Sequence, residues 1–310
     1  MKTNIYRYLT YLCCPLCKGQ LTFDTADLTC KACNRTYPIV DGIPRFIHNT
    51  SEDLQLSVQK WDISYLKQLK AQHYEKEFAG YKAMYFEDTF EQLNDVKKIK
   101  GSVYLEIGSG LFFMGQLLAK QCTLVIGIDI SPGALKVAKT MLLEKNIHNY
   151  LLIQGDILNM PLASNSVDLI YGGGVIEHFK NTQQCVNELY RVLRKGGVSF
   201  NSVPMLNIGS LTYRQAWGNI PNIPVLRQLA EVVHIRLLGS KHMIFGYEFS
   251  FLPSTLRKIH SAAGFKKISI DRFRVKLVFE FIPKILRRAL VILANKSPLF
   301  WPMLKVVAIK

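Results

Sequence analysis

Four cysteines near the start of the chain have the spacing of a metal site. Cys14 and Cys17 form one Cys-x-x-Cys pair, and Cys30 and Cys33 form a second pair twelve residues later. Each pair can fold as a tight turn that presents two thiolates, and two such turns complete the tetrahedral site that zinc prefers. Four thiolates leave no open position for a substrate, so we expect a structural zinc ion that replaces a core too small to fold alone. Cys13 is left over, because the Cys-Pro-x-Cys turn begins at Cys14.

A glycine-rich turn forms a second candidate site. Glu106, Gly108 and Gly110 alternate along the chain where an apolar segment ends and a helical pattern begins. Glycines at such a point let the backbone turn sharply and approach a ligand closely. The third glycine of a dinucleotide-binding turn is missing, because that position is Phe113. The turn therefore favours a nucleoside ligand that needs no pyrophosphate cradle.

Two carboxylates at the ends of later apolar segments support this interpretation. Asp129 comes nineteen residues after Gly110, where an acidic side chain can accept hydrogen bonds from both ribose hydroxyls of an adenosine. Asp156 ends the following segment, where it can accept a hydrogen bond from an adenine amino group. The next residue, Ile157, can pack on the adenine ring.

These residues need a scaffold in which strands alternate with helices. Short apolar runs predict strands, and the segments between them have helical patterns. Strands separated by helices imply a parallel sheet of the α/β class. The predicted strands are residues 103–107, 124–130, 150–154, 167–171 and 198–203, and the predicted helices between them are residues 112–120, 131–145 and 182–193.

The cysteine module resembles the small zinc-ribbon family that includes the activator subunit of tRNA and protein methyltransferases. The resemblance covers residues 12–47, with both cysteine pairs and the ending Tyr37-Pro38-Ile39-Val40-Asp41-Gly42-Ile43-Pro44. It implies a stabilising or docking role for this module, without a part in the chemistry.

Residues 102–204 resemble the class I methyltransferases that use S-adenosylmethionine (SAM), particularly the subgroup of quinone and small-molecule enzymes. The matching segments are the Glu106-x-Gly108-x-Gly110 motif, residues 161–170, residues 174–179 and residues 191–197. The family often has a further glycine two positions after Gly110, where this chain has Phe112. The resemblance implies a Rossmann-like fold and a SAM site made of Glu106, Gly108, Gly110, Asp129, Ile130, Asp156, Ile157, Tyr171 and Gly172.

Methyl transfer requires that the acceptor be held in line with the methyl group, and a general base helps when the acceptor is a hydroxyl. His178 is the candidate base because it follows the fourth predicted strand. A structural or helix-capping role for His178 is the alternative. We expect Asp168 to stabilise its strand end, and Glu177 either to take part in the site or to face solvent.

The whole chain divides into three predicted parts. Residues 1–50 form the zinc-ribbon module, residues 51–100 a helical connector, and residues 101–310 the SAM-dependent domain. Aromatic residues of the connector, among them Phe78, either cover the cofactor or belong to the core. In the last part we expect a helix over 253–263, a strand at 268–270 and an antiparallel closing strand at 303–309. Residues 274–302 then form an amphipathic insertion, which is either a lid or a contact with an anionic membrane.

Charge and composition constrain partners and location. The formal net charge is +16, and residues 257–310 hold thirteen Lys and Arg against Asp271 and Glu280. Such a patch fits RNA, anionic lipid, an acidic substrate or merely a solvated face. We see no secretory signal and no apolar run long enough to span a membrane, so we expect a cytoplasmic protein, with peripheral contact at the inner face of the membrane as an option.

Three functions remain open from the sequence. The first is methylation of a small-molecule, lipid-linked or glycan acceptor. The second is methylation of tRNA or rRNA, which the basic charge and the zinc ribbon favour. Against it, the fourth predicted strand is followed by Gly172, Gly173 and Gly174 and not by the Asn/Asp-Pro-Pro-aromatic loop of amino-methylating RNA and DNA enzymes. The third is a non-catalytic SAM-fold binding protein.

Overall fold

The fold is described here from a computed structural model of the 310-residue chain. The described residues are 5–24, 27–47, 58–59, 62–63, 65, 74–81, 87–211, 219–237, 248–273 and 284–310. Within them the chain divides into two compact units. The first comprises residues 1–171, 188–199 and Lys310, and the second comprises residues 172–187 and 200–309.

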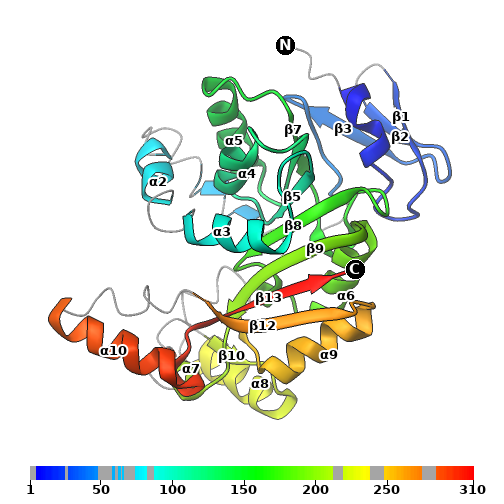
Figure 1. The fold of residues 1–310 in the computed structure, drawn as a ribbon. Coiled ribbons are helices and arrows are strands. Elements are labelled where there is room, and N and C mark those ends of the chain that lie inside the picture. The colour runs from blue at the N-terminus through cyan, green and yellow to red at the C-terminus, as the bar shows by residue number, and fades with distance from the viewer. Residues whose placement is uncertain are drawn as a thin grey trace. The chain divides into compact units, whose positions relative to one another are not determined.

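The first unit begins with a small antiparallel sheet that carries the cysteines. The 3-10 helix η1 (Ile5–Tyr11) precedes strands β1 (Leu21–Asp24), β2 (Asp27–Cys30), β3 (Thr36–Val40) and β4 (Ile43–Pro44). The four strands pair in chain order, each antiparallel to the next. Figure 1 shows them in blue at the N-terminal end of the chain. This arrangement is the predicted zinc ribbon.

The rest of the first unit alternates strands and helices as predicted. Its elements are α2 (Tyr74–Tyr81), α3 (Glu87–Val96), β5 (Val103–Ile107), α4 (Phe113–Leu118), β6 (Leu124–Asp129), α5 (Pro132–Glu144), β7 (Tyr150–Gln154), η3 (Ile157–Asn159) and most of β8 (Val167–Gly173). Strand β5 pairs in parallel with both β6 and β8, and β6 pairs in parallel with β7. Every residue of β5 and β7 is buried, which explains why their sequences are apolar apart from Glu106 and Gln154.

The second unit contains the closing part of the chain. Its elements are η4 (Ile176–His178), α7 (Ile208–Leu211), β10 (Asn219–Pro221), α8 (Pro224–Glu231), the π-helix η6 (Val232–Leu237), β11 (Glu248–Ser250), α9 (Pro253–Ala263), β12 (Lys267–Phe273), α10 (Lys284–Lys296), η9 (Pro298–Phe300) and β13 (Met303–Ile309). Strands β12 and β13 pair antiparallel, with Lys267 opposite Ile309. The predicted helix 253–263 and the antiparallel closing strand are therefore confirmed.

Besides β8, two elements continue from one unit into the other, namely α6 (Thr182–Val192) and β9 (Leu193–Pro204). The large sheet has the order β12-β13-β9-β8-β5-β6-β7. This is the expected mostly parallel sheet with an antiparallel closing strand. The predicted helix 182–193 is confirmed, but the predicted start of the next strand at residue 198 was wrong. Helix α6 ends at Val192 and β9 begins at once, because Gly196 and Gly197 exchange backbone hydrogen bonds with Lys310 instead of forming a free turn.

No helix among the described residues is long and apolar enough to cross a membrane. Of the predicted insertion 274–302, the structure describes residues 284–302, which form α10 and η9 between β12 and β13. Residues 274–283 lie outside the described residues.

Candidate functional site

The glycine-rich turn after β5 bends through three left-handed residues. Gly108, Gly110 and Phe112 have φ angles of 53°, 50° and 59°. The turn is fastened by hydrogen bonds from Ser109 N to the carbonyl of Ile128 at 3.0 Å and from Phe112 N to the carbonyl of Ser109 at 2.7 Å. The backbone therefore has the sharp conformation that the glycine spacing predicted.

Phe112 stands in this left-handed conformation where related turns often have glycine. A non-glycine residue pays a conformational cost at such a φ. The buried ring offsets that cost, since it fits into space left by two other glycines. A Cβ on Gly115 would lie 2.1 Å from Cζ of Phe112, and a Cβ on Gly127 would lie 2.9 Å from its Cδ2. The Phe112 side chain therefore points into the core between β6 and α4, and the turn keeps the left-handed conformation that glycine would adopt there.

Glu106 points toward the start of α4. Its Oε2 accepts hydrogen bonds from the N–H of Gly115 at 2.7 Å and from the hydroxyl of Tyr104 at 3.3 Å. Burial raises the pKa of the Glu106 carboxyl to about 8, although both hydrogen bonds act in the opposite direction. With these contacts Glu106 holds β5 to α4 and fixes the turn between them.

Asp129 lies directly beside the turn. Its Oδ2 accepts a hydrogen bond from Gly110 N at 2.7 Å, and its Oδ1 accepts one from Ser131 N at 2.9 Å. Its backbone carbonyl accepts a hydrogen bond from Gly155 N at 3.0 Å. Burial raises the pKa of the Asp129 carboxyl above its usual value. Asp129 therefore joins the turn after β5 to the loop after β7.

The loop after β7 carries the next two predicted residues. Asp156 accepts a hydrogen bond from Leu158 N at 2.9 Å and thereby caps η3, and burial raises the pKa of its carboxyl. Ile157 is buried, and Ile130 is half-buried with its carbonyl bonded to Gln154 Nε2. Contacts of the parallel strands thus gather the turn 108–110, residues 129–130 and residues 155–157 at the carboxyl ends of β5, β6 and β7.

The remaining predicted site residues lie at the end of β8 or shortly after it in the chain. Tyr171 is buried and stands opposite Glu106 in the β5–β8 pairing. Gly172, His178 and Glu177 belong to the second unit, where His178 ends η4 and its N–H bonds to the carbonyl of Val175. Glu177 is buried, so the expectation that it faces solvent was wrong.

Two connector residues reach the site without any sequence signal. Asp62 Oδ1 accepts hydrogen bonds from Ser131 Oγ and, at 2.8 Å, from Gly133 N at the start of α5. Tyr65 lies over the turn, with its hydroxyl 3.0 Å from the position of a Cβ on Gly110. Phe78, by contrast, packs against Phe113 and the core of α4 and α5, so its role is structural. The other aromatic side chains expected to cover the site, on residues 74, 81, 85 and 86, lie outside the described side chains.

The four predicted zinc ligands come together. All four sulfur atoms lie within 4.8 Å of one another, with 3.7 Å between Cys14 and Cys33 and 3.4 Å between Cys17 and Cys30. A tetrahedral site with Zn–S bonds of about 2.3 Å separates its sulfurs by about 3.8 Å, so this set fits zinc. A Cβ on Gly19 would lie 3.0 Å from the sulfur of Cys30, which explains the glycine at this position.

The two knuckles repeat one conformation. The residue after each second cysteine is left-handed, with φ 58° at Lys18 and 56° at Asn34. Each donates its N–H at 2.9 Å to the carbonyl of the first cysteine in its pair, Cys14 or Cys30. Both cysteine pairs are therefore shaped by the backbone to present their sulfurs to one point.

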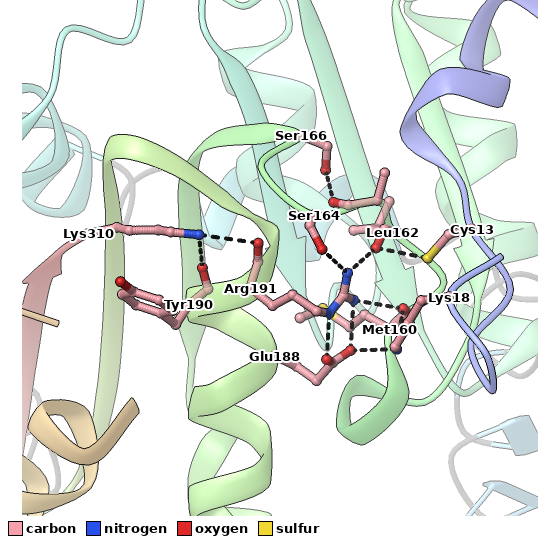
Figure 2. Close-up of polar contacts among 11 residues, drawn as sticks. Cys13, Lys18, Met160, Leu162, Ser164, Ser166, Glu188, Tyr190, Arg191 and Lys310 are labelled. Atoms are coloured by element: carbon pink, nitrogen blue, oxygen red, sulfur yellow. Dashed lines mark hydrogen bonds and ion pairs between the residues drawn. The ribbon is translucent and has the colours of Figure 1, made fainter. Parts of the chain in front are cut away.

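The zinc ribbon is bonded to the loop that follows η3. Cys13, the leftover cysteine, donates from Sγ to the carbonyl of Leu162 at 3.1 Å and has no place in the metal cluster. Figure 2 shows Lys18 and Arg191 converging on the buried Glu188, at 3.0 Å and at 2.6 to 2.8 Å. Both cations also donate to the carbonyl of Met160. The knuckle Cys14–Lys18 is thus tied to the segment that carries the predicted adenine contacts.

Asp168 has the structural role expected of it. Its Oδ2 accepts hydrogen bonds from Val103 N at 2.9 Å and from Arg194 at 2.8 Å.

A separate cavity of about 220 Å³ lies beside the ribbon and α5, and none of the predicted SAM or zinc residues lines it. Its walls are formed by Val40, Asp41, Ile43, Arg45, Asp62, Pro132, Gly133, Leu135, Lys136, Lys139 and Gln154.

Curated relatives match part of the chain, and two of them are described here by their identity and coverage. The biotin biosynthesis bifunctional protein BioHC of Cellvibrio japonicus is 34% identical over 119 residues, which are 38% of this chain and 22% of that protein. A demethylmenaquinone methyltransferase of Listeria monocytogenes is 36% identical over 73 residues, which are 24% of this chain and 31% of that protein. The chain therefore spans less than a third of the length of either relative.

A solved structure shares the fold. It is a chain of the complex between the Haloferax volcanii Trm112 methyltransferase activator and a methyltransferase, with a TM-score of 0.51 and 15% identity over 77% of this chain and 94% of that one. Two family descriptions match separate segments. Residues 6–42 match "Trm112p-like protein" and residues 105–200 match "Methyltransferase domain". One segment of this chain is accordingly similar to Trm112p-like proteins, and a later segment is similar to methyltransferase domains.

Proposed function

We propose that this protein is a SAM-dependent methyltransferase that acts on a small-molecule acceptor, with lipid-linked and glycan molecules among the candidate classes. The observation that carries the proposal is the contact of Gly110 and Gly155 with Asp129, which gathers three predicted SAM-binding segments at one sheet edge. The methyltransferase domain of residues 105–200 contains all three segments.

The residues present fit SAM. Gly110 leaves open the space that a Cβ would fill below the Tyr65 hydroxyl. Ser109 Oγ, in the same turn, is buried and has no hydrogen-bond partner among the described residues. Each Asp129 oxygen already accepts one backbone N–H and keeps a second lone pair for a ribose hydroxyl. A pyrophosphate group would find no third glycine here, because that position is Phe113.

In this proposal the chain's own residues bind and orient both reactants. Asp129 holds the ribose, Asp156 and Ile157 hold the adenine, and the turn 108–110 with Tyr171 and Gly172 lies against the methionine part. SAM supplies an activated methyl group on a sulfonium leaving group. The protein must then place the acceptor atom in line with that methyl group and exclude water. The buried Glu106 acts in this scheme by keeping the turn in place.

His178 is the proposed general base for a hydroxyl acceptor. The His178→Ala variant should bind SAM normally and lose about 100-fold or more in methyl transfer. The exposed His148 on the loop before β7 is the matched control, and His148→Ala should keep full activity. A His178→Ala variant with full transfer would remove the residue from the chemistry.

The zinc ribbon has a supporting role in the proposal. A reduced four-thiolate zinc site suits the cytoplasm, where thiols stay reduced, and we propose that location. Its hydrogen bonds to Met160 and Leu162 hold the segment that follows Asp156 and Ile157.

The experiment that tests the proposed function is transfer of a radiolabelled methyl group from SAM by the zinc-loaded full chain. Lipid, small-molecule and RNA fractions of a cell extract serve as acceptors in parallel. The proposal expects label in the lipid or small-molecule fraction. Label confined to RNA would favour an RNA methyltransferase, and SAM binding without any transfer would favour a non-catalytic binding protein.

A further inference from the structure

Helix α8 exposes its apolar side chains and shields its cation. Val225 and Leu229 are 68% and 60% exposed. Arg227, which lies between them, is half-buried, with its guanidinium carbon 4.4 Å from the ring centroid of Phe249. A helix on a surface that meets only water shows the opposite arrangement, with cations outside and leucines inside. The outer face of α8 is therefore built for an apolar neighbour.

Helix α10 also exposes large apolar side chains. Leu286 and Leu293, seven residues apart and so on one side of the helix, are 59% and 61% exposed, while Ala294 is buried. The exposed Arg288 and Lys296 each lie four residues from the exposed Ile292, and so on its side of the helix. An outward apolar stripe with flanking cations is the pattern of a helix that lies in a membrane interface.

The elements that carry the exposed apolar side chains of the second unit contact one another in series. Helix α10 contacts η9, η9 contacts α7, α7 contacts β10, and β10 contacts α8. Figure 1 shows α10, α7 and α8 following one another along the same border of this unit. We call the exposed residues on these elements and on η6 the apolar rim. The rim consists of Ile208, Leu211, Val225, Leu226, Leu229, Val232, Val233, Leu237, Leu286, Ile292, Leu293, Leu299 and Phe300.

The same unit carries most of the positive charge of the chain. Its residues, 172–187 and 200–309, include seventeen Lys and Arg against five Asp and Glu, an excess of twelve out of the net +16. A unit that combines this excess charge with thirteen exposed large apolar residues complements an anionic bilayer, which offers negative headgroups above an apolar interior.

Other occupants fit less well. A second copy of the chain would bring two units of +12 together and be repelled. RNA would satisfy the charge but would leave the aliphatic side chains of the rim in water, since nucleic acid is held through phosphates, base edges and aromatic stacking. No described helix is long enough to cross a bilayer, so the contact must be with the surface.

We propose that the apolar rim is a docking surface for anionic lipid bilayers, in which the exposed leucines enter the interface and the surrounding Lys and Arg contact the headgroups. The surface belongs to the second unit alone and stands whichever molecule accepts the methyl group. It would bring the enzyme to acceptors that reside in or on a membrane.

Co-sedimentation of the zinc-loaded full chain with vesicles tests the proposal. One vesicle type contains phosphatidylcholine with about one third phosphatidylglycerol, and the other contains phosphatidylcholine alone. We expect binding to the anionic vesicles, at least tenfold weaker binding to the neutral ones, and loss of binding in 0.5 M salt.

The variant Leu229→Ser/Leu293→Ser should weaken binding to the anionic vesicles at least tenfold. Leu143→Ser is the matched control, because Leu143 is also exposed but lies on α5 in the first unit. All three replaced side chains are exposed, so circular dichroism and the thermal midpoint should stay unchanged.

Equal binding of the double variant and the wild type to anionic vesicles would overturn the proposal, as would no binding at all. A dimer in light scattering that the double variant abolishes, without vesicle binding, would reassign the rim to self-association. SAM binding measured without vesicles reports separately on the proposed function, so either idea can fail alone.

Discussion

The backbone N–H of Gly110 donates a 2.7 Å hydrogen bond to Oδ2 of Asp129. This contact links the end of β5 to the end of β6, and Ser131 N fixes the other carboxylate oxygen at 2.9 Å. The carboxylate is therefore oriented before any ligand arrives, which lowers the cost of ordering it on binding. A ribose with two neighbouring hydroxyls meets two acceptor oxygens whose positions are already set.

The buried Glu106 makes stability depend on pH. Its pKa is raised to about 8 in the fold, against about 4.5 unfolded, so the folded state favours the protonated form. Its contribution to stability is complete below pH 4.5 and is lost as pH rises through about 8. We expect Glu106→Gln to remove this decline and to be more stable than wild type at pH 9, as measured by urea unfolding between pH 5 and 9. Parallel stability curves for the two proteins would contradict this expectation.

The fit of Phe112 predicts a strong effect of a small substitution. Gly115→Ala should destabilise the fold by about 3 kcal/mol, because the added Cβ would lie 2.1 Å from the Phe112 ring. Combining it with Phe112→Ala should give a loss smaller than the sum of the single losses by about 1 kcal/mol or more. Gly80→Ala on α2, where a Cβ meets nothing within 4 Å, should be neutral or slightly stabilising. Additive losses in urea unfolding would show that the ring and Gly115 are not coupled.

We expect bound zinc to stabilise the SAM site, because it holds the knuckle Cys14–Lys18 in place. Cys30→Ser should lose the metal, lower the thermal midpoint and weaken SAM binding, because the displaced knuckle releases Lys18 from Met160. Cys13→Ser is the control, since Cys13 lies outside the cluster and a serine hydroxyl can still donate to Leu162. It should keep one zinc ion per chain by atomic absorption. Loss of zinc from Cys13→Ser with retention in Cys30→Ser would reverse the ligand assignment.

The cluster of Lys18, Glu188 and Arg191 should contribute more to the stability of the fold than an exposed ion pair does. Glu188→Gln leaves Lys18 and Arg191 without their shared carboxylate and should cost about 2 kcal/mol near neutral pH. Burial alone would raise the pKa of Glu188, but Arg191 and Lys18 outweigh it and hold that pKa below its usual value. The contribution is therefore present above the ordinary pKa of 4.5 and is lost as pH falls through the lowered pKa of the folded state, where the two proteins should converge.

The matched control for Glu188 is an exposed pair. Glu75 lies 3.5 Å from Lys145 and its side chain is 58% exposed. Glu75→Gln should change stability by less than about 1 kcal/mol. Equal losses for Glu188→Gln and Glu75→Gln would show that the cluster is no more than a surface pair.

Local patterns in the sequence were sufficient to predict the strands of the candidate SAM site and the carboxylates at their ends. Buried strands made mostly of apolar residues are easy to recognise, and a carboxylate at the end of such a strand has a predictable place in a parallel sheet. Asp129 therefore could be placed beside Gly110 from spacing alone. The cysteine pairs were equally predictable, because four thiolates at this spacing have few other arrangements.

Features that depend on tertiary contacts could not be predicted. The left-handed Phe112 is acceptable only because Gly115 and Gly127 leave room for its ring, and the sequence does not show that Gly127 on β6 lies beside it. Asp62 and Tyr65 reach the site from a connector whose sequence resembles any polar helix. The outward leucines of α8 also follow from packing, since Arg227 takes the inner position against Phe249.

The most direct test of the account is calorimetric titration of the zinc-loaded full chain with SAM, for the wild type and for Asp129→Asn. Asn keeps the size of the side chain but removes the charge and replaces one acceptor oxygen with a donor. Asp271→Asn on β12 is the control, because that exposed carboxylate contacts only its own neighbour, Arg272 N, among the bonds described. The account predicts one saturable site in the wild type and in Asp271→Asn, with affinity at least about 30-fold weaker in Asp129→Asn. No binding to the wild type, or equal binding by Asp129→Asn, would contradict it.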